Sequence, residues 1–184
     1  MANKRTDEEL IGILDRTIAW IENCDSKTSI FLGVLGALGG ILLATDYVKK
    51  FLEIYRYMIN HINFWAAIYL IFYIISIGFI VAGIVSWIRV LFARVDIKEF
   101  SSRGCKTDSL IFFSSIASYG LFSMYKEKIE NCESEEMTED LISQIYICSI
   151  ICDKKFKYYK FGLIFASIGF TMLAVLLLIW LLFI

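Results

Sequence analysis

The sequence predicts an all-α membrane protein with three transmembrane helices and long amphipathic cytoplasmic helical extensions. Its 184 residues are 58% hydrophobic and have a mean hydropathy of +0.66, which is above the range of soluble chains. The chain contains no proline, so no residue obliges a long helix to kink or stop. Three apolar stretches approach the roughly 20 residues that a helix needs to cross the hydrocarbon core of a bilayer.

The predicted spans are residues 29–45, 64–88 and 161–184. The first is the shortest, with 17 residues, and is accepted because it contains no charged side chain. The second has aromatic residues at both ends, as expected where a helix meets the two membrane surfaces. These stretches set the number of crossings at three.

Lys and Arg are distributed unevenly around the spans. If the N-terminus is cytoplasmic, 15 of the 18 basic residues lie inside and the other three lie in residues 46–63, outside. The positive-inside rule therefore predicts a multi-pass protein with a cytoplasmic N-terminus. The short external connection, residues 46–63, is rich in aromatic residues, and we expect it to lie on the membrane surface.

Residues 1–28 are predicted to form a cytoplasmic amphipathic helix that continues into the first span. Thr6 and Glu9 have the spacing of a capping box, in which each side chain binds a backbone amide at the start of a helix. Leu10 and Leu14 then begin an apolar stripe at helical spacing.

Residues 89–160 form the larger cytoplasmic region. The sequence Ser-Ser-Arg-Gly at 101–104 indicates a turn. Residues 110–124 are too short and too rich in serine for a fourth span, so one helix packed within the cytoplasmic region is preferred to a membrane-embedded one. A further helix is expected to start at a Thr138 cap and to run unbroken into the third span. The acidic residues within 133–140 are interpreted as solvated helix ends and linker.

The charged residues where the cytoplasmic helices meet the membrane have two interpretations. Asp25 and Lys27 precede the first span, and four lysines precede the third: Lys154, Lys155, Lys157 and Lys160. Such charges ordinarily mark the interface or anchor a helix to anionic lipid. Lysines that converge can instead neutralise the phosphate of a bound nucleotide. Spacing alone favours the interfacial interpretation.

Small residues in the first span form a candidate packing face. Gly33, Gly36 and Gly40 would allow another helix to approach closely in lipid, from the same chain or from another subunit. Cys148 and Cys152 lie one helical turn apart, but on the apolar stripe and without a neighbouring His, so they are interpreted as core residues rather than metal ligands.

The sequence also argues against several classes of function. No hydrolase or metalloprotease motif is present, so we expect no catalytic residues, no metal, no cofactor and no enzymatic activity. A net charge of -1 excludes a globally basic nucleic-acid binder.

Three short segments resemble the transmembrane effectors of bacterial Pycsar antiphage systems. Residues 20–27, Trp-Ile-Glu-Asn-Cys-Asp-Ser-Lys, look like the aspartate-x-lysine segment before the family's first span. Residues 110–117, Leu-Ile-Phe-Phe-Ser-Ser-Ile-Ala, are similar to a second family segment, with Ser114 in place of a glycine. Residues 144–149, Gln-Ile-Tyr-Ile-Cys-Ser, followed by the lysines near 155, look like the helix that precedes the family's last span.

The resemblance implies a membrane effector rather than an enzyme. A separate cyclase would supply a cyclic pyrimidine mononucleotide, cyclic UMP or cyclic CMP, and the effector would oligomerise and impair the bacterial inner membrane, causing growth arrest or cell death. Membrane lipid, the nucleotide and further copies of the chain are the expected partners. The residues expected in or beside the nucleotide site are Asp25, Lys27, Phe113, Ser115, Tyr146, Lys154, Lys155 and Lys157.

Two other functions fit the composition. A nucleotide-independent small membrane scaffold or channel component would have the same spans and the same charge pattern. A membrane enzyme of lipid or peptide chemistry is disfavoured because the sequence offers no nucleophile or metal-ligand set.

Overall fold

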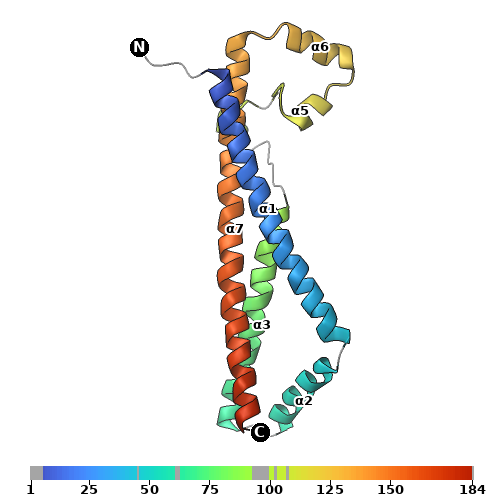
Figure 1. Ribbon diagram of the computed structural model, residues 1–184, viewed down its shortest axis with the longest axis vertical. Coiled ribbons are helices and arrows are strands. Elements are labelled where there is room, and N and C mark those ends of the chain that lie inside the picture. The colour runs from blue at the N-terminus through green and yellow to red at the C-terminus, as the bar shows by residue number, and fades with distance from the viewer. Residues whose placement is uncertain are drawn as a thin grey trace, which may run out of the picture. The chain divides into compact units, whose positions relative to one another are not determined.

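A computed structural model describes residues 6–44, 46–60, 63–92, 100–101, 103–106 and 108–183 of the chain (Figure 1). These residues form helices and turns and contain no strand, which confirms the all-α class. The helices are α1 (Asp7–Ala44), α2 (Tyr47–Asn60), α3 (Phe64–Leu91), α5 (Phe113–Ala117), α6 (Phe122–Glu130) and α7 (Ser134–Phe183).

Three of the described helices, α1, α3 and α7, are long and apolar enough to cross a membrane. Glu9 N donates to Thr6 Oγ1 over 3.4 Å, as the capping-box spacing predicts. From this cap, α1 continues without a break through the first predicted span. The third apolar stretch is likewise the C-terminal part of one helix of 50 residues, α7. Long helical extensions of the spans are therefore confirmed.

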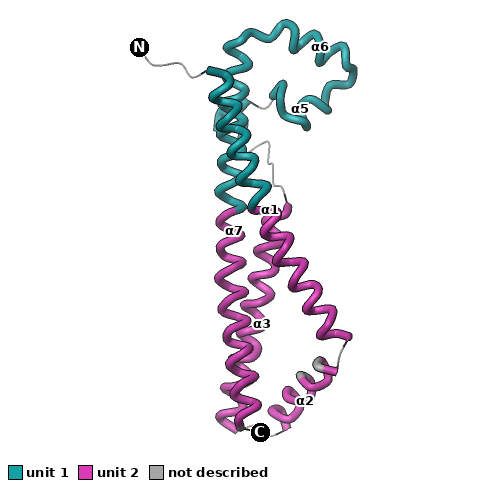
Figure 2. Tube along the Cα trace, viewed as in Figure 1, with its two compact units in different colours: residues 1–23, 93–155 teal, residues 24–92, 156–184 magenta. Residues whose placement is uncertain are grey.

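The chain divides into two compact units (Figure 2). Unit 1 comprises residues 1–23 and 93–155, and unit 2 comprises residues 24–92 and 156–184. Helices α1 and α7 each contribute to both units, whereas α5 and α6 belong to unit 1 and α2 and α3 belong to unit 2.

Within unit 2, α3 and α7 approach so closely that their backbones touch. A Cβ atom added to Gly83 would lie 2.8 Å from the backbone nitrogen of Ala166, and one added to Gly169 would lie 2.8 Å from the backbone nitrogen of Ile80. A side chain at either glycine would force the helices apart. Small residues bring transmembrane helices into van der Waals contact in this way, where lipid offers no hydrophobic driving force.

Helix α1 meets this pair at an aromatic cluster. Trp87, which is only 3% exposed, lies against Gly162 and stacks on Phe31 of α1 with ring centroids 5.2 Å apart. The Phe31 ring also lies 6.4 Å from the ring of Tyr159 on α7. One residue of α1 therefore contacts both other spans.

The glycines of the first span do not take part in such packing within the chain. A Cβ atom at Gly33, Gly36 or Gly40 would meet no described atom within 4 Å, apart from the atoms of its own helix turn. The close helix contact within the chain is instead made by α3 and α7. Contact of the α1 glycines with a second copy of the chain stays a prediction.

Two expectations about the region after residue 100 are wrong. Residues 110–124 do not form one helix, because α5 ends at Ala117 and α6 begins at Phe122. Ser118 ends α5 by donating from its Oγ back to the carbonyl oxygen of Ser115 over 2.6 Å. Thr138 is not a helix cap, because α7 starts four residues earlier at Ser134 and Thr138 lies within the helix.

The turn predicted at residues 101–104 is present. The amide of Gly104 donates to Ser101 O over 3.0 Å, and the amide of Cys105 donates to Phe100 O over 3.1 Å. Gly104 has a φ of 74°, the left-handed conformation that glycine adopts most easily. These two bonds form a Schellman motif, which closes a helical turn at Phe100.

Candidate functional site

A buried carboxylate organises the segment of unit 1 that precedes α5. Asp140 of α7 is 0% exposed, and its Oδ2 accepts hydrogen bonds from Ser109 Oγ over 3.0 Å and from the amide of Leu110 over 2.7 Å. Its other oxygen, Oδ1, is also buried and has no hydrogen-bond partner among the described residues. Burying a carboxylate is costly unless hydrogen-bond donors surround it. The two bonds to Asp140, called the Asp140 anchor below, therefore hold residues 109–110 to α7.

The anchor continues into the backbone of the turn. Ser109 Oγ accepts hydrogen bonds from the amides of Ile111, over 3.2 Å, and Phe112, over 3.0 Å. Tyr125 of α6 donates from its hydroxyl to Leu110 O over 3.0 Å. Hydrogen bonds from both α6 and α7 therefore fix the conformation of residues 109–112.

This turn presents an aromatic side chain to solvent. Phe113 is the first residue of α5 and is 75% exposed, with its ring centroid 4.7 Å from that of Phe112. An exposed phenylalanine on a hydrogen-bonded turn can stack on a flat ligand at little cost in conformational entropy. A role for Phe113 in the nucleotide site stays a prediction.

A small ionic cluster lies in the same unit. Glu136 Oε1 accepts from Lys106 Nζ over 2.9 Å and lies 3.5 Å from Lys128 Nζ. Lys106 is also held through its amide, which donates to Ser143 Oγ over 2.9 Å. Because two ammonium groups share one carboxylate, these three side chains carry a net positive charge.

The pKa values of the cluster reflect this pairing. The Lys106 hydrogen bond, with the charges of Lys106 and Lys128, holds the pKa of the Glu136 carboxyl below its ordinary value. Burial alone would lower the pKa of Lys106, but its hydrogen bond to Glu136 and the nearby carboxylates, including Asp140, raise the pKa above its ordinary value. Both shifts favour the charged forms, so the Lys106–Glu136 pair is ionic at neutral pH.

Lys128 also borders an open cavity of about 320 Å³ between α6 and the residues before it. The cavity is lined by the following residues: Tyr119, Met124, Glu127, Lys128 and Asn131. Its lining therefore combines one aromatic ring with one ammonium group and one carboxylate. Sequence reasoning did not single out any of these residues.

The interpretation of residues 133–140 as solvated linker is wrong for two of its acidic residues. Asp140 is buried and Glu136 is paired, while Glu133, Glu135 and Glu139 are exposed. A run of acidic residues does not reveal which member faces the core. One signal was present: Asp140 directly precedes Leu141, the first residue of the apolar stripe.

Five of the sequence-predicted site residues belong to unit 1. Phe113 is exposed, Ser115 is half-buried, and Tyr146, Lys154 and Lys155 follow one another along α7. Tyr146 is exposed and Lys154 is half-buried, whereas Lys155 is only 7% exposed. The Ser109–Asp140 anchor joins the segment carrying Phe113 to the helix that carries the other three.

The remaining three predicted site residues belong to unit 2. Asp25 is half-buried, while Lys27 and Lys157 are exposed. Asp25 and Lys27 lie between Cys24 and Thr28, which are both buried, and Thr28 Oγ1 donates to Cys24 O over 2.8 Å. The two charged residues therefore flank the packed face of α1.

The cysteines offer no metal site in the described part of the chain. Cys24 is buried, and the other four, including Cys148 and Cys152, are half-buried; all are free thiols. No three His, Cys, Asp or Glu side chains among the described residues gather closely enough to hold a metal ion.

Comparison with known proteins identifies the class of protein that has three such spans together with a unit like unit 1. A sequence profile of the Pycsar effector protein domain matches residues 9–182, which include nearly all of both units. The chain therefore belongs to the Pycsar effector family of transmembrane proteins that act in antiphage defence. It is 30% identical over 185 residues to the Pycsar effector protein GmPycTM of Gulbenkiania mobilis, covering 94% of this chain and 93% of that protein. No solved structure matches the chain.

The match confirms the family that the three sequence segments indicated. It also confirms a transmembrane effector as the general kind of molecule, because the matched family is one of membrane effectors and not a known enzyme family.

Proposed function

We propose that this protein is activated by a cyclic pyrimidine mononucleotide, cyclic UMP or cyclic CMP, and that it then oligomerises and impairs the inner membrane. Growth arrest or death of the infected cell would follow. The observation that supports this most strongly is the family match, which includes unit 1 as well as the three spans. A separate cyclase would supply the nucleotide when infection is sensed.

We assign nucleotide recognition to the eight residues expected from the sequence. Lys155 is the first residue to test, because its side chain is only 7% exposed and a charged hydrogen bond to phosphate is strongest where water is excluded. Phe113 and Tyr146 supply exposed aromatic faces that can stack on the base, a contact worth about 1 to 3 kcal/mol. A cyclic phosphate carries one negative charge, which the lysines would balance.

Two helices offer a covalent route from nucleotide to membrane. Helices α1 and α7 each begin in unit 1 and end in unit 2, so they connect the proposed sensor directly to the spans. The ligand can change the arrangement of the spans only if it binds the active state more tightly than the resting state. The continuous backbone of α1 and α7 provides the physical link between the proposed nucleotide site and the spans.

Assembly is proposed to use the glycine face of α1. Gly36 and Gly40 meet no other described part of the chain, and α1 is the least buried of the three candidate spans. A second copy of α1 could approach this face closely, in the manner of small-residue motifs in membranes. We propose a homo-oligomer in the bacterial inner membrane, with the N-terminus in the cytoplasm.

Direct binding tests the ligand. Isothermal titration of the detergent-solubilised protein with cyclic UMP or cyclic CMP should show saturable binding, and cyclic AMP serves as the purine control. K155Q should weaken this binding about tenfold, the size expected for losing one charge-assisted hydrogen bond. K126Q removes an exposed lysine paired with Glu130 and should leave the affinity unchanged.

Two results would count against the proposal. If neither pyrimidine nucleotide binds the wild-type protein, the ligand class is wrong. If K155Q binds as tightly as K126Q, the ligand class stands and the lysine assignment fails.

A further inference from the structure

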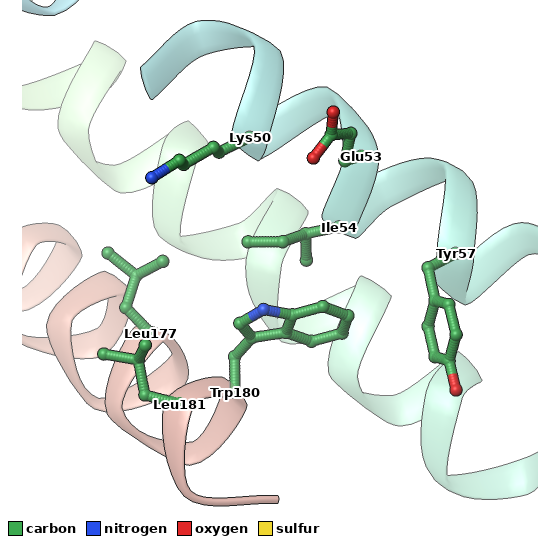
Figure 3. A pocket seen from close by; sticks show the side chains of 7 residues that line it. All are labelled: Lys50, Glu53, Ile54, Tyr57, Leu177, Trp180 and Leu181. Atoms are coloured by element: carbon green, nitrogen blue, oxygen red, sulfur yellow. The ribbon is translucent and has the colours of Figure 1, made fainter. Parts of the chain in front are cut away.

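Unit 2 contains a second cavity, of about 600 Å³, between α2 and the last turns of α7 (Figure 3). Its α7 wall is apolar and consists of Leu177, Trp180 and Leu181. Its α2 wall includes two charged side chains, Lys50 and Glu53. The cavity therefore combines a long apolar surface with one positive and one negative group.

The apolar wall is held in place by contacts with two other helices. The ring of Tyr57 on α2 packs edge-on against Trp180, with centroids 5.6 Å apart. Tyr69 of α3 lies 6.5 Å from the Trp180 ring and donates from its hydroxyl to Leu176 O over 3.2 Å. These contacts fix the indole, so the cavity is part of the packed structure of unit 2.

The two charged side chains of α2 lie on the side of the helix that borders the cavity. Lys50, Glu53 and Tyr57 are spaced at i, i+3 and i+7, so they lie along one side of α2, and Figure 3 shows Lys50 reaching toward the α7 side of the cavity. Lys49 lies on another side, where its side chain is 78% exposed and pairs with Asp46 over 2.7 Å. Lys50 and Glu53 are exposed as well, so their charged groups can meet water while they border the apolar α7 wall of the cavity.

The position of the cavity along the spans indicates its occupant. Its α7 residues, Leu177, Trp180 and Leu181, belong to the last turns of α7, at the end of the third candidate span. Trp180 and Tyr57 are residue types enriched at the level of lipid headgroups, where one end of the ring is apolar and the other meets water. An apolar cavity with these two ring types at the end of a span has the composition expected of a lipid-facing site.

We propose that this cavity binds one phospholipid with a primary ammonium headgroup, of the phosphatidylethanolamine type. An acyl chain would lie along Leu177 and Leu181, and Trp180 would pack beside the glycerol backbone. Lys50 would bind the phosphate and Glu53 the ammonium group, so that the two charges of α2 match the two charges of the headgroup. A trimethylated choline cannot donate hydrogen bonds to Glu53, and a glycerol headgroup has no positive charge for it.

Native mass spectrometry of the full chain tests this site. The protein is released from detergent after incubation with equimolar phosphatidylethanolamine, phosphatidylcholine and phosphatidylglycerol of identical chains. The wild type should retain one phosphatidylethanolamine per chain several-fold more often than either competitor. E53Q should remove the preference for ethanolamine over choline, and K50Q should lower the retention of all three lipids.

Two further variants separate the cavity from general lipid binding. L177W fills the apolar part and should abolish the retained lipid, whereas K49Q removes the neighbouring charge outside the cavity and should behave as the wild type. Circular dichroism checks that each variant keeps its helix content. The proposal is overturned if E53Q keeps the wild-type headgroup preference, or if K50Q and K49Q retain lipid equally. Should L177W fail to fold, E53Q and K50Q still decide the question.

Discussion

Ser109 Oγ donates a hydrogen bond to the buried Asp140 Oδ2 over 3.0 Å, and so ties the segment before α5 to the long helix α7. The same hydroxyl oxygen accepts two backbone amides from the following turn. One serine therefore connects the carboxylate to the conformation that presents Phe113. The first prediction tests this connection.

Replacing Asp140 by alanine should destabilise unit 1. The substitution leaves the Ser109 hydroxyl and the Leu110 amide buried without their acceptor, a cost of about 2 to 4 kcal/mol. The apparent melting temperature in detergent should fall clearly for D140A. E139A removes the exposed carboxylate next to it and is the matched control. Equal melting temperatures for the two variants would show that the anchor is not important for stability.

The Lys106–Glu136 pair should make stability dependent on pH. The pKa of Glu136 lies below its ordinary value of 4.5, so the pair contributes stability above pH 4.5 and loses it as the pH falls through the lower, folded-state pKa. E136Q should therefore melt below the wild type at pH 7, and the two should converge at acidic pH. E130Q, which breaks the exposed pair with Lys126, should differ less from the wild type at pH 7. A gap for E136Q that does not narrow as the pH falls below 4.5 would contradict the linkage.

Alanine substitution should lower the melting temperature at a glycine of α3 but not at a glycine of α1. G83A places a methyl group against the backbone of α7 and should lower the melting temperature in detergent, because the helices must separate to accommodate it. G36A meets no described atom and should leave the melting temperature of the monomer unchanged. A neutral G83A would show that α3 and α7 do not pack as closely as in this structure.

Bulky residues on the α1 glycine face should impair function without impairing insertion. G36L combined with G40L would block close approach of a second α1, and should reduce nucleotide-triggered dye release from liposomes several-fold. Membrane fractionation checks that the variant is inserted. If the double variant assembles and leaks like the wild type, this face is not the functional interface.

Topology can be measured by labelling single cysteines in intact cells, starting from a cysteine-free variant. A membrane-impermeant maleimide added from outside should modify K49C, in the connection between α1 and α3, and spare E135C at the start of α7. Both side chains are exposed, so accessibility to solvent does not favour either one. The reverse pattern would place the N-terminus and unit 1 outside the cytoplasm.

Features determined by local sequence were predicted well. The three spans and the continuous helices α1 and α7 follow from apolar runs without proline, and the Thr6 cap and Gly104 turn follow from short-range chemistry. The short segments that contain Asp25 and Tyr146 resemble segments of the Pycsar effectors, and the family match confirms this resemblance.

Features that depend on contacts distant in the sequence were not predicted. The Asp140 anchor joins residues about 30 positions apart, and the one local signal, that Asp140 directly precedes Leu141, does not reveal these distant partners. Likewise, Gly83 and Gly162 become neighbours only when α3 and α7 pair, whereas Gly36 and Gly40 form a visible motif on one helix. The break between α5 and α6 depends on a bond from Ser118 that competes with helix propagation.

The α3–α7 contact also restricts how unit 2 can move. Ile80 lies in the notch left by Gly169, and Trp87 lies in the notch left by Gly162, so both helices carry their interlocking positions seven residues apart. Sliding one helix along the other by about 10 Å, or seven residues, would bring only one of the two side chains back opposite a glycine. The two helices therefore form a rigid pair with a fixed register. Helix α1 contacts this helix pair through Phe31, so α1 is the span that can exchange its contacts while α3 and α7 stay together.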